Sequence, residues 1–196
     1  MVYDYHVVLG VAATAVNLFG FVPYLRDIFR GTTKPHPFTW FMWALVGSVG
    51  FFAQLAGGGG AGAWATGAGA FMCFFVGILS LSRGEKHIVM LDWLCLAGAL
   101  TGLVLWRLTD EPLLAVVFAT VADALGFVPT FRKSYAKPYE ETASAYALAA
   151  LAFSLSIVAL DTLSLTTILF PAYIILSAGS LFILLMVRRR QLGPQG

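Results

Sequence analysis

The chain is poor in charged residues, and this excludes most classes of soluble domain. Only 11% of its 196 residues are Asp, Glu, Lys or Arg, whereas 59% are hydrophobic. Soluble domains have about 25% charged residues, and fewer than half of their residues are apolar. The net charge of +2 is also too small to indicate binding to nucleic acid. With a mean hydropathy of +0.84, the composition predicts a protein that spans a lipid bilayer.

Residues that commonly build a metal or catalytic centre are equally scarce. The two cysteines, Cys73 and Cys95, both fall within apolar stretches, where a cysteine usually serves as a small hydrophobic residue. The three histidines, His6, His36 and His87, lie far apart in the sequence. The sequence contains no paired carboxylates, nucleophile motif or phosphate-binding loop. We therefore expect no metal, no cofactor and no enzymatic activity.

Several apolar stretches are long enough to cross a bilayer, which takes roughly 20 residues in a helix. They are apolar on all sides and do not alternate with polar residues, which favours helices over barrel strands. The run of four glycines at 57–60 predicts a tight turn. We expect an all-α membrane protein with seven transmembrane helices, at about residues 6–24, 38–56, 61–82, 88–106, 112–131, 142–160 and 163–187.

The basic residues are unevenly distributed among the predicted loops. All of the 12 Lys and Arg residues except Arg107 follow the first, third, fifth or seventh helix. Basic loops remain in the cytoplasm during insertion, so we expect the N-terminus outside and the C-terminus in the cytoplasm. The expected location is a bacterial cytoplasmic membrane, with the lipid bilayer as the surrounding partner.

The sequence also contains an internal repeat. Segments 13–26 and 119–132 both carry Gly-Phe-Val-Pro followed by an arginine three residues after the proline. Further along, Trp43 and Tyr146 each precede Ala-Leu. The first and second helices therefore correspond to the fifth and sixth helices.

Two three-helix units point in the same direction only if one extra helix separates them, because three is an odd number. We therefore expect a first three-helix repeat at 1–87, a linker helix with its loop at 88–111 and a second three-helix repeat at 112–196. An axis along the membrane normal would relate the two repeats.

With this layout and its two proline-containing loops, the sequence resembles the PQ-loop/SWEET-like (MtN3-like) transporter superfamily. The motifs that carry the resemblance are the Gly-Phe-Val-Pro stretches at 20–23 and 126–129, each near the cytoplasmic end of a repeat's first helix. Tyr24 and Thr130 stand where the family has Gln, and the third and seventh helices lack the Asn that sugar-binding members use. The resemblance implies transport by alternating access and leaves the substrate open.

Two polar residues lie at the midplane of the predicted helices. A charged side chain there costs about 2.5–3.5 kcal/mol and usually faces the bundle interior. Asp123 is near the middle of the fifth helix, and Asn17 is its equivalent in the first. We expect both to bind a small polar solute between the repeats, with Trp43 and Tyr146 lining the site. A desolvated carboxyl group favours its neutral form, so Asp123 is also a candidate for binding a coupled proton. The alternative is that Asp123 only makes a structural hydrogen bond between helices.

Two prolines, Pro23 and Pro129, also occupy equivalent positions in the repeats. A proline within a helix removes a hydrogen bond and kinks the chain. We interpret the pair as hinges that close the cytoplasmic mouth, and the alternative is that each proline only ends its helix.

The leading functional hypothesis is a small-solute transporter that works by alternating access. The alternative is a non-transporting seven-helix membrane receptor or scaffold. A retinal-binding protein would need a lysine in the seventh helix, and the last lysine in the chain is Lys137. The sequence also leaves open whether the chain forms a homo-oligomer.

Overall fold

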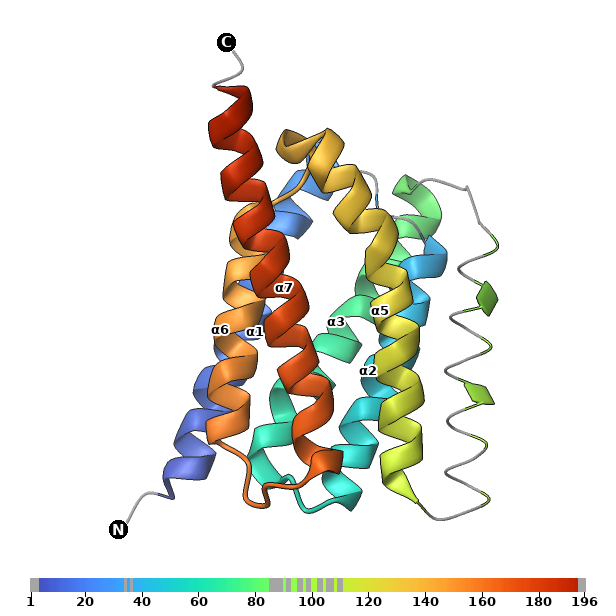
Figure 1. Cartoon of the computed structure of the whole chain (residues 1–196), viewed down its shortest axis with the longest axis vertical. Helices are drawn as coiled ribbons and strands as arrows, with labels where there is room; N and C mark the ends of the chain where they lie inside the picture. The colour runs from blue at the N-terminus through green and yellow to red at the C-terminus, as the bar shows by residue number, and fades with distance from the viewer. Residues whose placement is uncertain are drawn as a thin grey trace.

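Helices account for all regular secondary structure in the part of the chain that the structure describes (Figure 1). The structure is a computed structural model that describes residues 4–33, 35, 37–84 and 111–193, together with eight residues between 90 and 108. Two short 3-10 segments, η1 (Gly60–Ala63) and η2 (Pro138–Glu140), precede α3 and α6. The long helices are α1 (Tyr5–Phe29), α2 (Pro37–Ala56), α3 (Trp64–Arg83), α5 (Pro112–Ala136), α6 (Ala143–Val158) and α7 (Leu165–Leu192).

The predicted linker at 88–111 falls largely outside the described residues. The eight that are described there have helical backbone and exposed side chains: Met90, Trp93, Leu94, Ala97, Leu100, Thr101, Val104 and Leu108. The existence of a linker helix between the repeats stays a prediction.

Four of the helical segments are long and apolar enough to cross a membrane, namely Tyr5–Phe29, Thr39–Ala56, Gly60–Arg83 and Leu165–Leu192. Two shorter apolar segments, Pro112–Val128 and Ala143–Val158, belong to α5 and α6. These findings confirm a helical protein with several candidate membrane spans.

Several polar side chains are buried in this bundle, while many large apolar side chains are exposed on its surface. Asn17, Gln54 and Asp123 are 5%, 0% and 4% exposed, whereas Phe71 and Leu176 are 68% and 72% exposed. A soluble domain mostly buries its large apolar side chains and leaves its polar ones in water. Buried polar side chains together with an apolar outer surface suit a bundle that is surrounded by lipid tails.

The six long helices fall by chain order into a first group, α1 to α3, and a second group, α5 to α7. Helix α3 packs against both α1 and α2, and α7 packs against both α5 and α6. The two groups meet where α1 packs on α6 and where α2 packs on α5. The described chain begins at one end of the bundle and finishes at the other, which we call the N-terminal end and the C-terminal end (Figure 1).

The N-terminal end of the bundle is tightly closed around the glycine run. Gly58 and Gly60 have φ angles of 78° and 53°, which favour glycine because it lacks a Cβ atom, so the predicted turn is confirmed. A Cβ atom on Gly62 would lie 2.7 Å from the backbone of Leu160. Gly62 therefore lets the turn before α3 rest directly on the segment after α6.

A buried hydrogen bond also joins the two groups of helices near this end. The Nε2 atom of Gln54 on α2 donates to the carbonyl oxygen of Thr167 on α7 at 3.0 Å. Both residues are fully buried. Breaking this hydrogen bond would leave two polar groups without a partner in the interior. The cost of doing so stabilises the closed arrangement.

Candidate functional site

A cavity of about 530 Å³ lies inside the bundle, and all six long helices contribute to its wall. It extends from Thr66 and Phe170, near the starts of α3 and α7, past Asn17 and Asp123 to Glu141 and Thr142 at the C-terminal end. Its described wall residues include none from the glycine run or from the segment after α6. The close packing of the glycine run against Leu160 therefore lies beyond the described wall of the cavity at the N-terminal end.

All four residues predicted to bind solute line this cavity. Asn17 and Asp123 come from α1 and α5, and Trp43 and Tyr146 come from α2 and α6. Each pair thus draws one residue from each group of three helices. That they bind a solute or a proton stays a prediction.

Asp123 places a carboxyl group in the interior of the bundle. It is 4% exposed, and among the described residues its Oδ2 atom has no hydrogen-bond partner. The Tyr173 hydroxyl lies beside this carboxyl but lacks a partner in hydrogen-bond geometry. A buried polar group without a partner is costly and calls for an explanation such as a ligand.

Asn17, in contrast, is tied to the protein. Its Nδ2 atom donates to the carbonyl oxygen of Ala65 on α3 at 2.7 Å. A Cβ atom on Gly69 would lie 2.9 Å from the same Nδ2 atom, so glycine at this position makes room for the amide. The hydrogen bond leaves the Oδ1 atom of Asn17 as the part of the side chain that is available to a ligand.

Aromatic rings from three helices form much of the cavity wall. Trp40 lies at the centre of the group, with ring centroids 4.9 Å from Tyr24 and 5.2 Å from Trp43. Trp43 in turn lies 5.7 Å from Phe127. Of these, the sequence predicted only Trp43, although Trp40 and Trp43 are three residues apart on one helix and therefore share a face.

Comparisons with known proteins do not assign the chain to a family. No protein-family model, curated protein or solved structure matches it. The chemistry of the cavity wall is what indicates a function.

Tyr146 is anchored at the C-terminal end of the cavity by the loop before α6. Its hydroxyl donates to Oε2 of Glu141 at 2.9 Å. The next residue, Thr142, donates through Oγ1 to Oδ2 of Asp27 on α1 at 3.2 Å. These contacts connect the second group of helices to the first at the C-terminal end, where Glu141 and Thr142 line the cavity.

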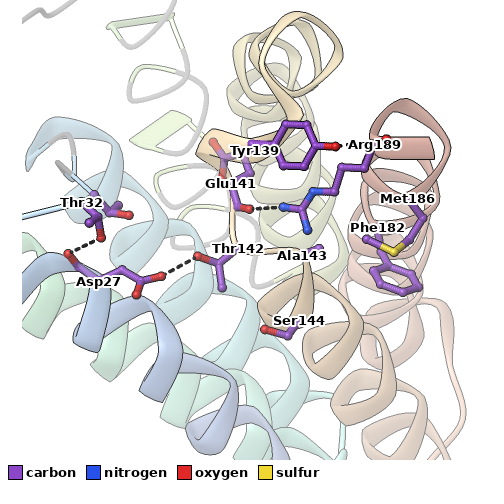
Figure 2. Close-up of a pocket in the computed structure, with 11 residues that line it drawn as sticks. Asp27, Thr32, Tyr139, Glu141, Thr142, Ala143, Ser144, Phe182, Met186 and Arg189 are labelled. Atoms are coloured by element: carbon purple, nitrogen blue, oxygen red, sulfur yellow. Dashed lines mark hydrogen bonds between the residues drawn. The ribbon is translucent and has the colours of Figure 1, made fainter. Parts of the chain in front are cut away.

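A second pocket of about 510 Å³ lies at the same end and shares Glu141 and Thr142 with the central cavity (Figure 2). Arg189 of α7 shapes it by donating through Nη2 to the carbonyl oxygen of Glu141 at 2.6 Å. It also donates through Nε and Nη2 to the carbonyl oxygen of Pro138, at 3.0 Å each. The guanidinium group therefore holds the loop before α6 and is occupied by backbone contacts.

The two predicted hinge prolines both lie inside helices that continue beyond them. Pro23 lies within α1, which ends at Phe29, and Pro129 lies within α5, which ends at Ala136. The interpretation that each proline ends its helix is therefore wrong. In Figure 1 the last turns of α5 lean towards α7 at the C-terminal end, as expected for a proline kink. Their role as hinges stays a prediction.

Among the described residues, no group of three or more His, Cys, Asp or Glu side chains could hold a metal ion. The sequence did not predict Glu141, Thr142 or Arg189 as part of a site. These residues lie in a loop and at a helix end, and their contacts join residues about 50 or more positions apart, which periodicity cannot reveal.

Proposed function

We propose that the chain is a small-solute membrane transporter that works by alternating access. The observation that carries the proposal is a cavity between the two groups of helices, which holds an oxygen atom of Asp123 that has no hydrogen-bond partner among the described residues. A cavity that is open towards one side and closed by packing on the other is one of the two states that alternating access requires.

The proposal includes two parallel three-helix repeats joined by a linker helix. In such an arrangement α1 corresponds to α5, α2 to α6 and α3 to α7. When each helix is replaced by its counterpart, every main helix–helix contact corresponds to another contact of the bundle. The contact of α1 with α3 becomes that of α5 with α7, and the contact of α1 with α6 becomes that of α5 with α2. The equivalent burial of Asn17 and Asp123 supports the same relation.

In this proposal the C-terminal end of the bundle faces the cytoplasm, because the basic residues gather there. Arg26, Arg83 and Arg189 all occupy the last turns of helices that finish at this end. The cavity would then be in its inward-facing state. Movement of the two groups about their shared interface, assisted by the proline-containing helices α1 and α5, would close this end and open the other.

Labelling of single cysteines tests the movement without knowledge of the solute. In a background that lacks both native cysteines, Thr142→Cys would report on the C-terminal end and Leu160→Cys on the closed end, where Leu160 is 2% exposed. We expect an impermeant maleimide to label Thr142→Cys rapidly from the C-terminal side. It should label Leu160→Cys slowly, and only from the opposite side.

The slow labelling would report brief opening of the N-terminal end. If Leu160→Cys never reacts in folded protein, whatever solutes are added, the bundle does not alternate and the receptor or scaffold alternative gains support.

A further inference from the structure

The described part of the cavity wall contains acidic residues and no basic ones. Asp123 and Glu141 are its acidic residues, and none of its described residues is Lys, Arg or His. Asp123 is 4% exposed, and its Oδ2 atom has no hydrogen-bond partner among the described residues. A buried carboxylate is stabilised by a positive charge at hydrogen-bond distance, and without one it carries an uncompensated desolvation cost.

Aromatic faces surround the same space. Tyr24, Trp40, Trp43 and Phe127 form a continuous group, with successive ring centroids 4.9, 5.2 and 5.7 Å apart, and all four line the cavity. Phe127 lies one helical turn from Asp123 on α5, so the carboxyl group and this ring share one face. Aromatic faces attract cations, most strongly in a desolvated site with Trp, and they commonly bind quaternary ammonium groups.

The size of the cavity restricts the ligand further. Its volume of about 530 Å³ lies within the roughly 300–1,000 Å³ of sites for small organic molecules. A bare metal ion or ammonium ion would leave most of this space and the aromatic walls unfilled. The described wall also offers no basic side chain to a ligand carboxylate, which disfavours acids and amino acids.

We infer that the solute is a monovalent organic cation with an apolar or aromatic body and no carboxylate, whose charged group pairs with Asp123 against the rings of Trp43 and Phe127. The inference deepens the proposed transport function and rests on the same cavity. The neutral side chain of Asn17, whose amide nitrogen is already bound to Ala65, would offer its oxygen to a polar hydrogen of the ligand.

Three probes of similar size test the inference on the purified, unmodified protein in lipid nanodiscs. Benzyltrimethylammonium supplies the cation, N,N-dimethylbenzamide is neutral, and N,N,N-trimethylphenylalanine adds a carboxylate to the same cationic group. Isothermal titration calorimetry should show binding of the cation with an affinity at least about tenfold higher than that of either comparator. Equal affinities for the three probes, or no binding of the cation, would overturn the inference.

A matched pair of variants tests the role of Asp123. Asp123→Asn removes the charge with little change in shape and should weaken binding of benzyltrimethylammonium by roughly 100-fold. Asp4→Asn makes the same chemical change at the exposed cap of α1, where Asn also caps well, and should leave the affinity unchanged. Unchanged affinity in folded Asp123→Asn would contradict the inference, and the probe comparison above decides the matter if this variant does not fold.

Failure of the inference can be distinguished from failure of the proposed function. Selective cation binding without uptake into proteoliposomes would support the inference and contradict transport. Uptake of a neutral or anionic solute that the cation does not inhibit would support transport and contradict the inference.

Discussion

Asp123 and Asn17 occupy equivalent positions in the sequence repeat, yet their surroundings differ. Asn17 donates to the backbone of α3 in a space that Gly69 provides. Asp123 has a bulky neighbour, Tyr173, and its Oδ2 atom has no hydrogen-bond partner in the described part of the chain. The two residues thus offer different groups to the middle of the cavity, so we expect a solute to be bound asymmetrically.

The most informative single substitution is Asp123→Asn in a transport assay. The amide has nearly the shape of the acid, so we expect the variant to fold and to elute as the unmodified protein does in size-exclusion chromatography. Its initial rate of uptake should fall by about tenfold or more, because the buried charge that pairs with the solute is gone. Asp4→Asn is the control, and equal uptake by both variants would assign Asp123 a structural role.

Gly69 should tolerate no larger residue. A Cβ atom there would lie 2.9 Å from Nδ2 of Asn17, so Gly69→Ala would displace the amide or the helix. We expect a loss of about 1–3 kcal/mol in the free energy of unfolding, measured by thermal or denaturant unfolding in detergent.

Gly179 provides the matched control, because a Cβ atom there meets nothing within 4 Å. Gly179→Ala within α7 should stabilise the protein by about 0.5–1 kcal/mol through its higher helix propensity. If both variants lower stability equally, the close approach of Gly69 to Asn17 is not what requires glycine.

At the scale of the elements, the sequence predicted the positions of the helices better than their ends. The first span was expected at 6–24, and α1 runs from Tyr5 to Phe29. The hydrophobic pattern detects only the part of a helix that lies in lipid, whereas α1 continues through the polar residues that follow Pro23. The same holds for α5, which was expected to finish near 131 and continues to Ala136.

The loop before α6 is an element whose conformation depends on α7. Arg189 is the residue that holds it, through the carbonyl oxygens of Pro138 and Glu141. Arg189→Lys keeps the charge but loses the planar fork that reaches both acceptors. We expect faster amide hydrogen exchange in 138–142, measured by mass spectrometry.

Arg190 is the control for this substitution, because its side chain is exposed at the same helix end. Arg190→Lys should leave exchange in 138–142 unchanged. An identical exchange pattern for the two variants would show that the backbone contacts of Arg189 do not order the loop.

At the scale of the whole molecule, the account predicts that the two termini lie on opposite sides of the membrane. An odd number of spans and the one-sided distribution of basic residues both require this arrangement. A reporter fused after Gly196 should be active in the cytoplasm, and a tag before Met1 should be accessible from outside. Detection of both termini on one side would contradict the seven-helix topology and the parallel repeats.

The central cavity could be predicted only in part from the sequence. Charge at midplane depth and the internal repeat pointed to Asp123, Asn17, Trp43 and Tyr146, all of which line it. Tyr24, Trp40 and Phe127 were not predicted, because aromatic residues near span ends usually belong to the membrane interface. Their assembly around one space depends on how three helices face one another, which no single segment encodes.

The most direct test of transport is uptake into proteoliposomes that contain the purified protein. Separate labelled solutes should represent organic cations, sugars, amino acids and organic acids, and liposomes with Asp123→Asn and without protein serve as controls. The account predicts saturable uptake of at least one class, strongest for an organic cation and reduced in Asp123→Asn. If no class enters faster than it enters protein-free liposomes, while the folded protein still binds a solute in its cavity, the chain is a receptor or scaffold and the proposed function is wrong.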